Sequence, residues 1–204
     1  MGLFFSGSAI AERAAPDVLS ELSLYAKKHR GDLRQAAPSE NSADHLICDS
    51  QCRNTIVMYP NSFCQWDEAS AHLSRNLKTS VLSFHVHDGD LWMYVFFVNG
   101  RRKDAFNPVP DYWNPLTRHE RSKWTGSAEI LSKHWPDLEL KSVQRYLVPW
   151  TETNRGSKAY KTDEATCGNP WQLVDFLRAF KLKYPVQPDG TQLGEMFSFS
   201  VAED

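Results

Sequence analysis

Residues 80–106 constrain the fold of this chain more than any other segment, because two hairpin turns divide them into three strand-forming runs. The dipeptides Asp88-Gly89 and Asn99-Gly100 favour two-residue turns, since Asp, Asn and Gly tolerate the positive φ that such turns require. The flanking runs are rich in Val, Phe, Tyr and Trp, which is typical of strands. The sequence therefore predicts a three-stranded antiparallel meander over about residues 80–106.

Two-residue loops also predict which side chains share a face of this meander. His87 is expected opposite Asp90 and His85 opposite Trp92; after the second turn, Val98 is expected opposite Arg101 and Val95 opposite Asp104. One face then carries mainly apolar side chains, namely Leu82, Phe84, Val86, Leu91, Met93, Val95, Phe97 and Phe106, with Arg102 and Asp104 among them. The other face mixes aromatic and titratable side chains, namely Val81, Ser83, His85, His87, Asp90, Trp92, Tyr94, Phe96, Val98 and Lys103. This second face is either covered by another layer or exposed as a binding surface.

The rest of the chain predicts helices on both sides of the meander in sequence. Helices are expected over residues 16–30, 67–76, 117–124, 127–135 and 169–182. Asp67 is the expected N-cap of the second, and Thr117 with Glu120 the expected capping box of the third. The last is expected because Leu173, Phe176, Leu177 and Phe180 follow the spacing of one helix face. Further strands are expected at 55–60, 143–148 and 195–201, and residues 32–54 read as a long loop. This order favours an α+β fold, with an antiparallel sheet built on the meander, in a single domain spanning residues 1–204.

Composition argues against several classes of partner. The 204 residues carry a formal net charge of -2 and a pI near 6.4, whereas proteins that bind nucleic acid usually carry a strong basic excess. Residues 101–123 have a local positive excess beside Phe106, Tyr112 and Trp113, but a solvated strand end and a helix explain the same residues. No stretch approaches the ~20 apolar residues of a membrane span. We therefore expect neither nucleic acid nor a membrane as the partner.

Cysteine usage predicts the compartment. The four cysteines include no CxxC pair and have no partners at zinc-finger spacing; they are Cys48, Cys52, Cys64 and Cys167. The first sixteen residues lack the basic leading region and the apolar run of a signal peptide. These features favour reduced thiols in a cytoplasmic protein.

Metal-ligand residue types concentrate only in the segment from His85 to Asp90. His85 and His87 are two residues apart on a strand, so both imidazoles point to one face, and Asp90 across the turn supplies a carboxylate. These three residues are candidates for a small hydrolase, with His85 and His87 as candidate metal ligands and Asp111 or His119 as a distant third ligand. The competing interpretation is structural, with His85 stacked on Trp92 and His87 paired with Asp90. We favour the structural interpretation and expect no metal or other cofactor.

The loop after the meander is the better candidate for function. Residues 107–113 combine two prolines with Tyr112 and Trp113, and rigid aromatic side chains dominate the hot spots of protein interfaces. The sequence therefore predicts a partner-binding surface made of Trp92, Tyr94, Tyr112 and Trp113, unless both loop aromatics turn inward and close the end of the sheet. No nucleophile elbow, phosphate-binding loop or dinucleotide fingerprint occurs.

These features favour an interaction module without catalysis that binds a protein partner. In size, mild acidity and order of elements the chain is similar to the bacterial immunity and inhibitor proteins, which bind a partner stoichiometrically, although it shares no motif with them. The alternative is the small hydrolase that uses His85, His87 and Asp90, with or without a metal.

Overall fold

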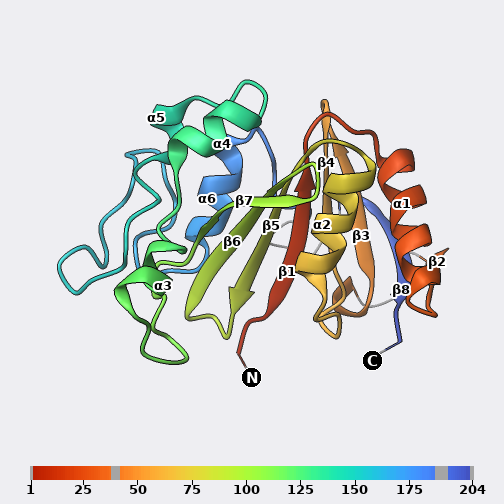
Figure 1. Ribbon diagram of the computed structural model, residues 1–204, viewed down its shortest axis with the longest axis horizontal. Helices are drawn as coiled ribbons and strands as arrows, with labels where there is room; N and C mark the ends of the chain where they lie inside the picture. The colour runs from red at the N-terminus through yellow and green to blue at the C-terminus, as the bar shows by residue number, and fades with distance from the viewer. Residues whose placement is uncertain (1, 38–41, 187–192, 203–204) are drawn as a thin grey trace.

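The computed structural model describes residues 2–37, 42–186 and 193–202, and its centre is one large sheet (Figure 1). The described strands are β1 (Phe5–Ile10), β2 (Asp32–Gln35), β3 (Leu46–Gln51), β4 (Asn54–Met58), β5 (Ser80–His87), β6 (Leu91–Val98), β7 (Arg101–Phe106) and β8 (Glu195–Ser200). They lie in the order β2-β8-β3-β4-β1-β5-β6-β7, and neighbouring strands are antiparallel.

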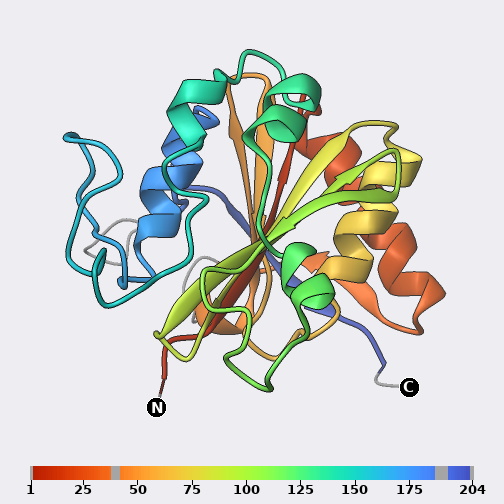
Figure 2. The same ribbon diagram turned by 60° about the vertical axis from the view of Figure 1, so that its left-hand side comes forward.

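Helices cover both faces of this sheet. They are α1 (Ala15–Lys28), the 3-10 turn η1 (Ser42–Asp44), α2 (Trp66–Asn76), α3 (Arg118–Ser122), α4 (Ala128–His134), α5 (Leu140–Val143) and α6 (Gln172–Ala179). Figure 2 shows α1 and α2 on one side of the sheet and α6 on the other, and α4 packs in the same core as α6. The expected α+β class and antiparallel sheet are confirmed, but the sheet has eight strands in the described part of the chain and extends well beyond the segment from which it was predicted.

Two segments have a different secondary structure from the one expected. Residues 32–54 were expected to form a loop but contain β2, η1 and β3. Strands β2 and β3 both pair with β8, which is distant in the sequence. Residues 143–148 were expected to form a strand, but Val143 ends α5 and Tyr146 is buried beside Phe176, with 5.7 Å between the ring centroids. Both errors have one cause. The secondary structure of a short segment depends on its contacts with distant parts of the chain, and the local sequence pattern does not reveal those contacts.

The turn between β5 and β6 shifts the register by one residue. Asp88 and Gly89 have the positive φ expected, 52° and 73°, and the Asp90 N–H donates to the His87 carbonyl at 2.9 Å. Asp90 is nevertheless an additional unpaired residue, so His87 lies opposite Leu91 and His85 opposite Met93. The expected pairs of His87 with Asp90 and of His85 with Trp92 are wrong, because one extra residue moves every β6 side chain to the other face.

The next turn keeps the expected register only at its start. Asn99 and Gly100 have φ of 50° and 76°, and Val98 lies opposite Arg101 as expected. A bulge at Phe96 and Phe97 then places Asp104 opposite Phe96 instead of Val95. Bulges of this kind are not visible in the alternation of residue types.

The shifted register sends the large β6 aromatics into the core. Trp92 and Tyr94 are fully buried and lie on the sheet face covered by α4, α5 and α6. There Tyr94 stacks on Phe176 of α6, with centroids 5.5 Å apart and planes 9° apart, and Trp92 lies 4.9 Å from the same ring. The expected helix face of α6 is confirmed, since the side chains that define it are all buried, namely Leu173, Phe176, Leu177 and Phe180.

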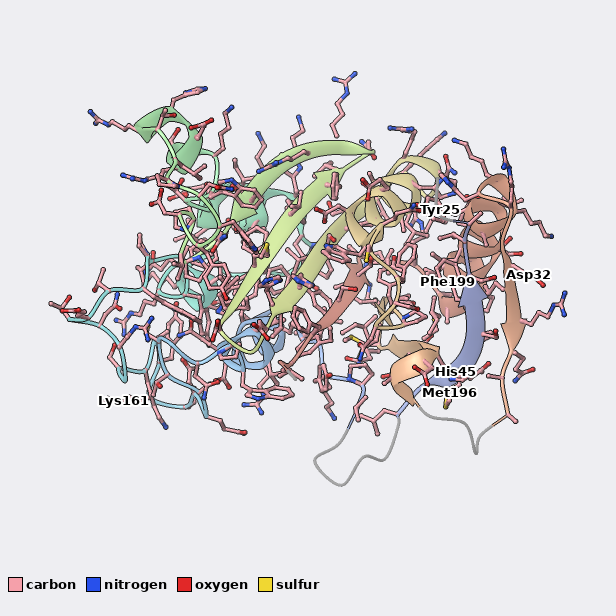
Figure 3. The ribbon with its side chains drawn as sticks, turned by 90° about the horizontal axis from the view of Figure 1, so that it is seen from below. Tyr25, Asp32, His45, Lys161, Met196 and Phe199 are labelled. Carbon is pink, nitrogen blue, oxygen red and sulfur yellow. The ribbon has the colours of Figure 1, made fainter. Side chains whose placement is uncertain are left out.

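A second core lies between the other face of the sheet and helices α1 and α2. Phe63, which precedes α2, contacts Tyr25 of α1 and Phe199 of β8, with ring centroids 6.4 Å and 5.1 Å apart. Tyr25 and Phe199 are labelled at this end of the molecule in Figure 3. β8, the strand expected at residues 195–201, lies between β2 and β3 and pairs with both.

Candidate functional site

A pocket of about 240 Å³ opens at one end of the sheet, on the face that α2 covers. We call it the His85 pocket; it is lined by Phe4, Phe5, Ser6, Asn61, Phe63, Cys64, Trp66, His85 and His87. These residues come from the start of β1, the segment before α2, the first residue of α2 and the end of β5. The lining is mainly aromatic and contains no carboxylate.

A wider hollow of about 490 Å³ lies elsewhere, beside Glu12, Arg13 and Arg53. Both of its arginines already have partners. Arg13 donates to the carbonyl oxygens of Glu12 and Leu77, and Arg53 forms an ion pair with Glu12. This hollow therefore offers no free cation to a ligand.

His85 is the most unusual group in the His85 pocket. Its ring stacks on Trp66, with centroids 4.3 Å apart and planes 9° apart, and only 6% of the residue is exposed. Its Nε2 lies 3.5 Å from Nδ1 of His87, whereas no group among the described residues forms a hydrogen bond with its Nδ1. A buried ring nitrogen without a partner is costly, so this atom needs an explanation.

Burial also makes His85 a weak base. Loss of solvation and the neighbouring His87 lower the pKa of His85 to about 4, against a smaller opposite effect of the Phe5 backbone. His85 is therefore neutral near pH 7, and so it can donate through one ring nitrogen and accept through the other.

This lowered pKa predicts a stability that depends on pH. An unfolded histidine binds its proton near pH 6.5, and the folded His85 does so near pH 4, so acidification through this window favours the unfolded state. Between about pH 7 and about pH 5 we expect the wild-type protein to lose about 2 kcal/mol more than His85→Phe, which has no proton to bind. Denaturant unfolding of both proteins at the two pH values measures the difference. Equal losses would contradict a depressed pKa for His85.

His87 lies among aromatic rings from two other segments of the chain. Its ring lies edge-to-face against Phe4, Tyr112 and Trp113, with centroid distances of 5.1, 5.6 and 4.9 Å. Tyr112 and Trp113 in turn contact each other at 5.1 Å. Such near-perpendicular pairs are a favourable arrangement of aromatic rings. The loop expected to carry function therefore does meet the end of β5.

Asp90 has a different role from the one expected. Its carboxylate accepts a hydrogen bond of 2.6 Å from the Tyr112 hydroxyl, and it does not line the His85 pocket. The structure thus brings His85 and His87 together but leaves Asp90 tied to the loop. The expected stacking of His85 on Trp92 is replaced by stacking on Trp66.

The loop that carries Tyr112 and Trp113 is held by its own hydrogen bonds. The Asn107 side chain accepts from the Val109 N–H at 2.8 Å, and the Tyr112 N–H donates to the Val109 carbonyl at 3.0 Å. The Asp111 carboxylate accepts from the Leu116 N–H and pairs with Arg121. Asp111 is therefore engaged in fixing the loop, and the loop is ordered before any partner arrives.

Exposed apolar side chains gather around His87. Leu3, Phe4, Tyr112 and Trp113 are four of the seven large hydrophobic residues exposed in the described part of the chain. The Leu3 carbonyl accepts from the Gly89 N–H at 2.9 Å, which holds the N-terminal segment against the β5–β6 turn; the two lie side by side at the lower end of the sheet (Figure 1). We call this set, with His87, the His87 surface.

Of the four residues expected to bind a partner, two contribute to this surface. Tyr112 and Trp113 are exposed, but Trp92 and Tyr94 lie fully buried on the opposite face of the sheet because of the register shift. Sequence reasoning missed Leu3, Phe4 and Trp66. The pair Phe4 and Phe5 was a weak indication of an exposed aromatic side chain, since neighbouring residues of a strand point to opposite sides of the sheet. No local feature of the sequence indicates that Trp66 stacks on His85.

The described residues contain no group of three or more His, Cys, Asp or Glu side chains arranged to hold a metal ion. No described helix is both long enough and apolar enough to cross a bilayer. Comparison of the chain with models of protein families, with curated proteins and with solved structures finds no match.

Proposed function

We infer that this protein is an interaction module without catalysis, which binds a protein partner through the His87 surface. One observation carries the proposal: Phe4, Tyr112 and Trp113 contact His87, Leu3 is held beside the β5–β6 turn, and all four side chains are exposed although each is large and apolar. Scattered exposed hydrophobic residues are ordinary, but a contiguous group of them is typical of a binding site. The likeness in type to immunity and inhibitor proteins fits this kind of stoichiometric binding.

Rigidity supports the same proposal. The Tyr112 hydroxyl is fixed by Asp90, and Trp113 packs against His87. Aromatic side chains that are already ordered lose little conformational entropy on binding, so more of their contact free energy becomes affinity. Tyr and Trp are also the residues most enriched in interface hot spots.

The hydrolase alternative has weaker support. A histidine acting as a general base is usually oriented by a carboxylate, whereas His85 and His87 contact each other and Asp90 is bonded to Tyr112. A neutral His85 with a pKa near 4 is also a poor base at pH 7. We therefore retain the non-catalytic function as the proposal.

We also propose a cytoplasmic location. The four cysteines are free thiols, two of them exposed, namely Cys52 and Cys64. Exposed free thiols suit a reducing compartment, since they oxidise readily outside the cell.

Capture of the partner tests the proposed function. The tagged wild-type protein is used to capture its partner from a lysate of the source cells, and the same experiment is done with Tyr112→Ala/Trp113→Ala. We expect the double variant to unfold cooperatively but to lose the partner, because each hot-spot side chain contributes about 2 kcal/mol or more to binding.

Leu24→Ala is the matched control, since Leu24 is 53% exposed on α1, away from the His87 surface. It should capture the partner as the wild type does. Retention of the same partner by a folded double variant would refute the proposal, and so would equal loss with Leu24→Ala.

A further inference from the structure

We propose that the His85 pocket receives a tyrosine side chain of the protein partner, and that the His85–His87 pair binds its phenol hydroxyl. This inference rests on the proposed function, and it names what the partner inserts. The pocket and the His87 surface share Phe4 and His87. A partner seated on the surface therefore lies over the mouth of the pocket.

The size of the pocket fits one side chain. Its volume of about 240 Å³ falls below the roughly 300–1,000 Å³ of pockets that hold drug-sized ligands. Anchor residues of interfaces typically fill pockets at the centre of the contact. The volume thus favours a single inserted side chain over a free metabolite.

The lining selects an aromatic and uncharged side chain. Phe4, Phe63 and Trp66 supply aromatic walls, which pack well against another ring. The lining contains no carboxylate to pair with a Lys or Arg side chain. Its histidine with the lowered pKa is neutral and offers no full charge to an Asp or Glu side chain. Burying an unpaired charge there would be unfavourable.

The histidine pair explains why the inserted ring carries a hydroxyl. If His85 donates from Nε2 to His87, then His85 Nδ1 is an acceptor and His87 Nε2 a donor; if the proton lies on His87 Nδ1, these roles reverse. The outer nitrogen of His85, Nδ1, has no hydrogen-bond partner among the described residues. A phenol both donates and accepts, so it can form a hydrogen bond with His85 Nδ1 whichever of the two states the pair adopts. A phenylalanine ring would leave this nitrogen unsatisfied.

The test compares p-cresol, which is the tyrosine side chain, with toluene, which is the phenylalanine side chain. Each is titrated into the purified protein while the imidazole resonances are followed by ¹⁵N–¹H NMR, with His85→Phe identifying the His85 signals among the seven histidines. We expect p-cresol to shift the His85 and His87 signals and to bind about tenfold more tightly than toluene, which corresponds to one hydrogen bond. In His85→Phe, which keeps a ring on Trp66, the preference should fall below about threefold.

Absence of p-cresol binding, or equal binding of p-cresol and toluene to the wild type, would overturn the inference. This comparison needs no variant, so it stands even if His85→Phe does not fold. It also needs no partner: the pocket can fail this test while capture through Tyr112 and Trp113 succeeds. Where capture succeeds, His85→Phe should weaken the partner's affinity about tenfold, and unchanged affinity would likewise overturn the inference.

Discussion

Replacing Phe176 with alanine is expected to lower the free energy of unfolding by about 3 to 5 kcal/mol. The ring is fully buried and contacts four other aromatic rings, those of Trp92, Tyr94, Tyr146 and Phe180. Its removal leaves a cavity at the point where α6 meets β6, and rings held from several elements relax poorly into such a space. Because domains have only about 5–15 kcal/mol of stability, the loss is a large part of the total.

Denaturant unfolding measures this change, with Leu24→Ala as the comparison. Leu24 lies on the solvent side of α1 and is half exposed, so its replacement should change stability by about 0.5 kcal/mol or less. A loss below about 1 kcal/mol for Phe176→Ala would show that α6 does not pack on the sheet as described.

Replacing Asp175 with alanine is expected to cost about 3 kcal/mol, although no apolar contact is lost. The Asp175 carboxylate accepts from the backbone N–H groups of Glu164 and Ala165, at 3.0 and 2.8 Å, and binds Arg178 at 2.8 Å. It thereby ties the loop before α6 to the helix. Alanine would leave two partly buried backbone N–H groups without an acceptor. Each buried donor left unsatisfied lowers the free energy of unfolding by about 1–3 kcal/mol.

Glu164→Ala separates this effect from the loss of an ion pair. Arg178 bonds to both carboxylates at 2.8 Å, but the Glu164 side chain is 78% exposed and that of Asp175 only 3%. An exposed pair contributes about 0–1 kcal/mol, so Glu164→Ala should be nearly neutral. Similar unfolding free energies for the two variants would contradict the role assigned to the Asp175 hydrogen bonds.

Helices were predictable where the chain repeats a local signal. The spacing of Leu173, Phe176 and Phe180 identified the buried face of α6, and Thr117 with Glu120 forms the expected capping box at the start of α3. Asp67, expected as the cap of α2, instead lies inside the helix and accepts from Ser83 of β5. The helix face of α6 and the capping box of α3 depend on residues within a few positions of one another. The position of Asp67 instead depends on its contact with another strand.

The candidate site was predictable only in part, for a related reason. His85 and His87 do share a face and approach each other, because alternation along one strand is a local property. Their partners were misassigned because the extra residue Asp90 changes the register across the turn. Trp66, which stacks on His85, is the first residue of α2. The residue pattern of β5 does not indicate that this helix lies over it.

The position of β8 has a consequence for biosynthesis. Residues 195–200 pair with residues 32–35 on one side and 46–48 on the other, so β2 has no partner in the sheet until β8 has left the ribosome. Strands β1, β4, β5, β6 and β7 instead find their sheet neighbours within residues 5–106. Closing the long loop to β8 is entropically costly. The half of the sheet that bears His85 and His87 can therefore assemble during translation, while the half around β2 waits for the distant strand.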